Sequence, residues 1–110
     1  MKEQSTFIRF IGDSPTARVL DYLLTVRELD VCISDLADNA HVGRATLYRI
    51  WKNLIHSKAI VHTRDIGKAK LYKLNTEEPK IKKLMEIDDM LLRDALKEKA
   101  SRLQMVVANR

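Results

Sequence analysis

The apolar positions near the start of the chain predict a helix from Pro15 to about Val26, because they recur at helical spacing. The inward positions of this helix are Ala17, Leu20, Leu23 and Leu24. Ser14 can accept a hydrogen bond from the free N–H groups of the first turn, and proline suits the first helical position. A short extended piece, LDVCI, then precedes a second, short helix, SDLADNA, for which Ser34 is the expected N-cap.

The third predicted helix runs from Arg44 to about His56 and has two different faces. Its inner face consists of Leu47, Ile50, Trp51 and Leu54. Its outer face gathers Ala45, Arg49 and Lys52, flanked by Thr46, Tyr48 and Asn53. This outer face has cations but no acid, whereas solvated faces usually carry both signs of charge. Trp51 lies at core spacing, so packing is favoured over a role as a stacking platform.

The hydrophobic period changes after the third helix. Two β-prone runs, Ile60 to Arg64 and Ala69 to Leu74, flank the letters DIGK, in which Gly67 can take a positive φ. This pattern predicts a hairpin over residues 60–74 with a basic tip. A long helix is expected to begin near Pro79. Its first apolar stripe is Ile81, Leu84, Ile87 and Leu91, and a later stripe is Leu92, Leu96, Leu103 and Val106.

Length and composition fit one domain with extensions. The chain has 110 residues, of which 45% are hydrophobic and 32% are charged. We expect an N-terminal arm over residues 1–11, a compact unit over residues 12–75, and a C-terminal helix over residues 76–110. The predicted fold class is mainly α with a small β-hairpin wing (α+β), in the order of a winged helix-turn-helix.

The positive charge is concentrated in one segment. Residues 43–73 contain eight cations and one acid, Asp65, whereas the remainder of the chain has a slight excess of acids. A basic segment of this kind indicates a polyanionic partner. A solvated face would be the usual explanation for one isolated cationic helix, but the adjoining basic hairpin favours a binding surface.

The chain resembles archaeal winged helix-turn-helix transcription regulators of the ArsR/MarR-like kind. The resemblance covers roughly Gly12 to Leu92 and rests on GDSPTARVLDYLL, SDLADNAHVGRATLYRIWKNL and GKAKLYKLN. One departure is Gly43, where a Ser or Thr cap would be usual before the third helix. Glycine is also an accepted N-cap, so only the side-chain cap is missing.

The resemblance implies that the third helix enters the major groove of double-stranded DNA while the wing lies on the backbone. Arg44 and Arg49 suit bidentate contacts to guanine, and Asn53 suits adenine if it reaches that far. The other expected contacts from this helix are Ala45, Thr46, Tyr48 and Lys52, with Thr46 and Tyr48 equally suited to phosphate. On the wing, the expected contacts to the DNA backbone are Arg64, Lys68 and Lys70.

The apolar stripes of the last helix extend further than a domain of this size can cover alone. We therefore expect a homodimer in which the same helix of a second chain covers them; the alternative is a helix folded back on its own domain. The expected dimerisation residues are Leu84, Ile87, Leu91, Leu92, Leu96 and Leu103. Two-fold symmetry would place the recognition helices about 34 Å apart and predict a palindromic site.

The sequence gives little support for metal binding or catalysis. The segment ELDVCISDL is similar to the ELCVCDL metal-sensing motif of ArsR repressors, but Asp30 replaces the first cysteine and the only thiol is Cys32. We expect a buried structural Cys32, no metal and no cofactor. No catalytic constellation occurs, so no enzyme is predicted.

With no secretory pattern and no bilayer-length apolar run, we expect a cytoplasmic protein without membrane contact. Competing functions are a weakly specific architectural DNA-binding protein and a winged-helix protein-interaction module. No sequence feature marks a pocket for a small-molecule effector.

Overall fold

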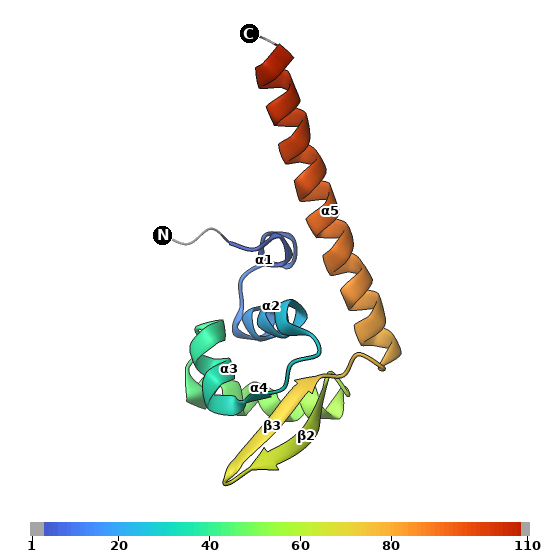
Figure 1. Ribbon diagram of the computed structural model, residues 1–110. Coiled ribbons are helices and arrows are strands. Elements are labelled where there is room, and N and C mark those ends of the chain that lie inside the picture. The colour runs from blue at the N-terminus through green and yellow to red at the C-terminus, as the bar shows by residue number, and fades with distance from the viewer. Residues whose placement is uncertain (1–3, 109–110) are drawn as a thin grey trace.

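The computed structural model describes residues 4–108, with side chains up to residue 105, and shows a winged helix with a long C-terminal helix (Figure 1). The helices are α1 (Thr6–Ile11), α2 (Pro15–Val26), α3 (Ile33–Ala40), α4 (Arg44–His56) and α5 (Pro79–Ala108). The strands are β1 (Val31–Cys32), β2 (Ile60–Ile66) and β3 (Ala69–Leu74). The predicted fold class is confirmed. Residues 1–3 and 109–110 of the expected termini, and the side chain of Val106, lie outside the described part.

Helix α2 begins and ends where the sequence predicts. The Ser14 hydroxyl accepts a hydrogen bond from the backbone N–H of Ala17 at 3.0 Å, and Pro15 occupies the first turn. Its buried residues are Ala17, Val19, Leu23 and Leu24, while Leu20 is only partly buried. Local capping chemistry and the apolar stripe therefore agree, which explains why this helix could be predicted closely.

Helix α3 begins two residues earlier than the expected N-cap implies. Cys32, not Ser34, occupies the N-cap position, and it makes no side-chain capping bond. The reason is that Cys32 is also the last residue of β1, so the chain passes from strand into helix without a separate capping turn. Cys32 is half-buried rather than buried, because it lies on the outer strand of the sheet.

The hairpin forms a three-stranded antiparallel sheet with β1, in the order β1-β3-β2. Strand β2 continues to Ile66, past the predicted end at Arg64, and a two-residue tip follows with Gly67 at φ 60°. The positive φ predicted for Gly67 is confirmed. The register shifts between His62 and Arg64, which marks a β-bulge in β2.

Helix α1 differs from the expected N-terminal arm. Residues 6–11 form a helix whose Phe7 and Ile8 are buried, because the short apolar patch FIRFI packs against α2 and α5. The hydroxyl of Ser5 caps it by accepting from the N–H of Ile8. A patch of this length carries too little periodicity to reveal a helix by itself.

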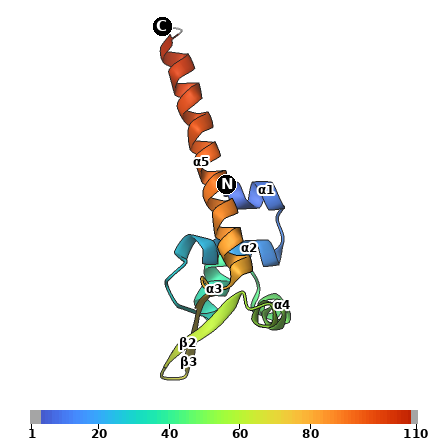
Figure 2. The same cartoon turned by 90° about the vertical axis from the view of Figure 1, so that its right-hand side faces the viewer.

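Helix α5 begins at Pro79, as predicted, and divides into two parts. Its first turns lie against the body, where Ile81 is buried and Leu84 and Leu91 pack against the core. Its later turns project away from the body, so the molecule measures 60 × 32 × 24 Å (Figure 2). The start of α5 therefore belongs to the core of the body. The expected division of the chain at residue 76 stays a prediction.

Candidate nucleic-acid interface

Helix α4 and the hairpin lie together at one end of the molecule, opposite the C-terminal end of α5 (Figures 1 and 2). The hairpin projects beyond the body beside α4. This arrangement brings the expected contact residues of the helix and of the wing to the same end. The two groups are 10 or more residues apart in the sequence, so it is the fold that brings them together.

The outer face of α4 is open to solvent. Six of the seven predicted contacts on this helix are exposed, namely Arg44, Ala45, Tyr48, Arg49, Lys52 and Asn53. Thr46 is half-buried, and its hydroxyl accepts a hydrogen bond from Nη2 of Arg49 at 3.1 Å. The Thr46 hydroxyl therefore orients Arg49, a role that the sequence did not reveal. Gly43 caps the helix without a side-chain bond, as expected.

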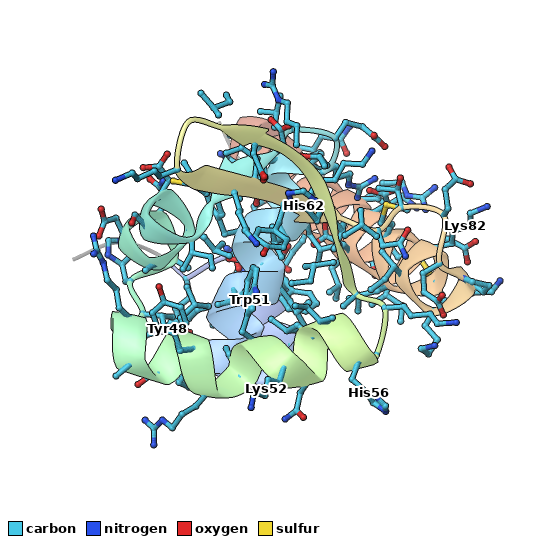
Figure 3. The ribbon with its side chains drawn as sticks, turned by 90° about the horizontal axis from the view of Figure 1, so that it is seen from below. Tyr48, Trp51, Lys52, His56, His62 and Lys82 are labelled. Carbon is cyan, nitrogen blue, oxygen red and sulfur yellow. The ribbon has the colours of Figure 1, made fainter. Side chains whose placement is uncertain are left out.

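The inner face of α4 fixes the helix to the body. Leu47, Trp51 and Leu54 are buried, and Ile50 is partly buried. Figure 3 shows Trp51 pointing from α4 toward the hairpin, where His62 lies, whereas Lys52 and His56 extend on the other side of the helix. The packed role predicted for Trp51 is confirmed. The outer side chains are thus held on a rigid helix.

The cations of the hairpin fall into two groups. Nearer the body, Nε of Arg64 lies 3.0 Å from Oδ2 of Asp30, and Nζ of Lys73 lies 2.9 Å from Oε2 of Glu28. Nearer the tip, Lys68 and Lys70 are exposed and make no ion pair within residues 4–108. The wing therefore presents two unpaired lysines at its tip and two cations paired with acids from the segment before β1.

The paired acids have shifted pKa values. The hydrogen bond from Arg64, followed by that from Thr63, lowers the pKa of Asp30, and the hydrogen bond from Lys73 lowers that of Glu28. Both acids therefore remain ionised at neutral pH and keep compensating their cations. Asp65, the one acid of the basic segment, has its Oδ1 2.6 Å from Nε2 of His62.

The expected dimerisation residues do not share one surface. Leu84 and Leu91 pack against the core of their own chain, because the first turns of α5 lie on the body. Leu92, Leu96 and Leu103 are exposed, as is Ile87. Phe10 and Ile11 of the apolar patch FIRFI, on α1, are exposed as well.

The structure contains open clefts but no metal cluster within its described part. A cleft of about 650 Å³ lies between α1, α2 and α5 and is lined by Ser5, Arg9, Asp21, Arg27 and Asp88, among others. Among residues 4–108, no three His, Cys, Asp or Glu side chains come together as metal ligands. No helix in that range is both long and apolar enough to cross a membrane.

Solved structures with a similar fold include MepR, a transcription regulator of Staphylococcus aureus, and AdcR, a competence repressor of Streptococcus pyogenes. A mutant of Staphylococcus aureus MepR bound to an oligodeoxyribonucleotide is 17% identical with a TM-score of 0.62, over 94% of this chain and 78% of that chain. A doubly substituted mutant of Lactococcus lactis ZitR, in apo form, is 15% identical with a TM-score of 0.59, over 86% of this chain and 76% of that chain. AdcR of Streptococcus pyogenes is 16% identical with a TM-score of 0.58, over 80% and 65%.

These identities show a shared fold. The neighbours are bacterial, so the archaeal character of the resemblance stays a prediction. No protein-family model matches the sequence, and no curated protein matches it either.

Proposed function

We propose that this protein is a transcription regulator that binds double-stranded DNA sequence-specifically, with α4 in the major groove and the wing of residues 60–74 on the backbone. The observation that carries the proposal is the two-sided character of α4. Its inner face is buried in the core, while its outer face is exposed, carries cations and has no acid. A rigid helix with such a face, beside a basic hairpin, suits groove recognition.

The proposed base contacts come from α4. Arg44 and Arg49 present guanidinium groups suited to the O6 and N7 atoms of guanine, and Asn53 presents an amide suited to adenine. Thr46 supports this assignment by orienting Arg49 through the 3.1 Å hydrogen bond. Ala45 and Tyr48 complete the surface.

The proposed phosphate contacts are Lys52 on the helix and Lys68 and Lys70 at the tip of the wing. Their positions suit contacts that hold the protein on the duplex without reading sequence. Arg64 lies on the same wing, but its guanidinium is already paired with Asp30.

We further propose that the protein acts as a homodimer. Leu96 is 65% exposed and Leu103 is 60% exposed on the part of α5 that projects from the body, and Phe10 of α1 is 65% exposed. Burying such side chains against a second copy would remove apolar surface from water. A two-fold axis would then predict a palindromic site with its half-sites about 34 Å apart.

The proposal is tested by fluorescence anisotropy at two salt concentrations. One probe is a duplex from the region upstream of the gene, and the other is a shuffled duplex of the same length. A regulator of its own gene is expected to bind the upstream duplex tightly, with steep salt dependence and a large preference over the shuffled one. Equal, salt-sensitive binding to both would favour the architectural function, and absence of binding to either would favour a protein-interaction module.

A further inference from the structure

Asp30 links the two outer strands of the sheet. It directly precedes β1, and yet its Oδ2 accepts hydrogen bonds from Oγ1 of Thr63 at 2.9 Å and from Nε of Arg64 at 3.0 Å, both on β2. Because β3 lies between β1 and β2, this carboxylate reaches across the middle strand. The Thr63 hydroxyl is also 3.2 Å from the backbone carbonyl oxygen of Leu71 on β3.

The β-bulge explains how two consecutive side chains meet one oxygen atom. In a regular strand, adjacent side chains point to opposite faces of the sheet. The register shift between His62 and Arg64 interrupts this alternation at Thr63, so Thr63 and Arg64 both reach Asp30. The bulge in the backbone of the wing therefore brings both side chains to the side on which Asp30 lies.

The same contact neutralises a wing cation. The side chain of Arg64 is 62% exposed, so it is accessible to a phosphate, whereas that of Asp30 is only 22% exposed. A phosphate that binds Arg64 through its Nε must replace Asp30 as the acceptor. Lys68 and Lys70 make no ion pair within the described residues, although Asp65 lies across the hairpin from Lys70.

We propose that Asp30 is a positioning residue that holds the Arg64 guanidinium through its Nε, compensates its charge and so weakens its contact with DNA phosphates. Asp30 would thereby limit the sequence-independent part of the affinity for duplexes. The inference rests on the proposed DNA-binding function. Its consequence is selectivity in a cell, because a regulator competes against a very large number of non-specific sites. Weaker backbone binding keeps more of the protein available for its operator.

The test is the salt dependence of binding to a shuffled duplex, measured for the full chain and for Asp30→Asn. Asparagine keeps an oxygen that accepts from Thr63 but loses the charge that holds Arg64. Each additional phosphate contact makes the slope of log K against log salt more negative by about 0.9. Asp30→Asn is therefore expected to increase the loss of affinity between 50 and 200 mM salt by a further factor of about 3.5.

A matched control separates this local effect from a change in net charge. Glu98→Gln adds the same charge and releases Arg102 from its ion pair, but on α5, away from the wing. Its salt slope is expected to equal that of the wild-type protein. The double variant Asp30→Asn/Arg64→Gln is expected to lose the additional slope, since the additional contact comes from Arg64.

The outcomes distinguish this inference from the proposed function. If the wild-type protein binds DNA with a steep slope but Asp30→Asn leaves the slope unchanged or makes it shallower, the inference is overturned and the proposed function stands. It is equally overturned if the double variant keeps the additional slope, or if Glu98→Gln acquires it. If the wild-type protein binds neither duplex, the proposed function itself is wrong.

Discussion

The indole ring of Trp51 meets the phenol ring of Tyr72 edge to face, with ring centroids 5.0 Å apart and ring planes at 88°. Trp51 belongs to α4 and Tyr72 to the middle strand of the sheet, so the pair joins the proposed recognition helix to the base of the wing. The ring of His62 lies 5.5 Å from that of Tyr72. The position of α4 is therefore coupled to that of the hairpin.

This coupling predicts a measurable interaction between the two rings. We expect a double-mutant cycle with Trp51→Leu and Tyr72→Leu to give a coupling free energy of about 0.5–1.5 kcal/mol, as for other edge-to-face pairs. The free energy of unfolding is measured by urea denaturation of the wild-type protein, both single variants and the double variant. Additive single effects would mean that the two rings fill space independently.

The link between α2 and α5 predicts a second effect on stability. Arg27 is the C-cap residue of α2. Its Nη2 lies 2.6 Å from Oδ1 of Asp89 and 3.4 Å from Oδ2 of Asp88, and Asp88 is only 8% exposed. Arg27→Gln would leave the buried carboxylate without its cation and is expected to cost about 1–3 kcal/mol in urea denaturation. Arg102→Gln, on an exposed pair of α5, is expected to change stability by no more than about 0.5 kcal/mol. Equal losses would contradict the structural role of Arg27.

Asp21 predicts a dependence of stability on pH. Burial is the largest cause of its raised pKa and the nearby Asp88 charge adds to it, although Ser5 opposes the shift by hydrogen bonding. A carboxyl whose pKa is raised by folding favours the folded state below its unfolded value and loses that contribution as pH rises. Asp21→Asn is therefore expected to raise the Tm at pH 7, by no more than about 4 °C because the group is partly exposed. The gain should disappear below pH 3.8, the unshifted value. A gain that persists there would indicate a cause other than ionisation.

The order of elements could be predicted because each one has a local signal. Ser14 and Pro15 mark the start of α2, Gly67 marks the tip of the hairpin, and the alternation of α4 separates an inner from an outer face. Helix α1 was missed because six residues hold less than two helical turns of pattern. The helix is stabilised by tertiary contacts instead: Phe7 is buried, and α1 packs against α5, which is distant in the sequence, as well as against α2.

The sequence predicts which charged residues form the candidate interface but not which of them form ion pairs. The eight cations of residues 43–73 indicate a basic surface, yet sequence alone does not show that Asp30 neutralises Arg64. That contact spans 34 positions and depends on the sheet order and on a bulge, neither of which has a local signature here. Sequence alone likewise does not show that Leu84 and Leu91 pack against the core of their own chain, because that contact depends on where α5 lies on the body.

Two substitutions separate the proposed base contact from the proposed phosphate contact. Arg49→Ala is expected to weaken binding to the upstream duplex by about 1–3 kcal/mol and to reduce its preference over the shuffled duplex. Lys70→Ala is expected to weaken both duplexes alike and to make the salt slope shallower by about 0.9. Anisotropy titrations at several salt concentrations measure both quantities. If Arg49→Ala weakened the two duplexes equally, its base-reading role would be wrong.

The projecting part of α5 makes the oligomeric state testable with one apolar-to-acid substitution. Leu92, Leu96 and Leu103 lie on one side of the helix. If a second copy buries this side, a carboxylate introduced there would lose its hydration without gaining a partner, which destabilises the dimer. Leu96→Asp is therefore expected to shift the mass measured by light scattering at micromolar concentration from dimer to monomer, while the helical circular dichroism of the body persists. Met90→Asp, on a different side of the same helix and also exposed, is expected to remain a dimer. A monomeric mass for the wild-type protein, or dissociation of both variants alike, would show that this side of α5 is not the interface.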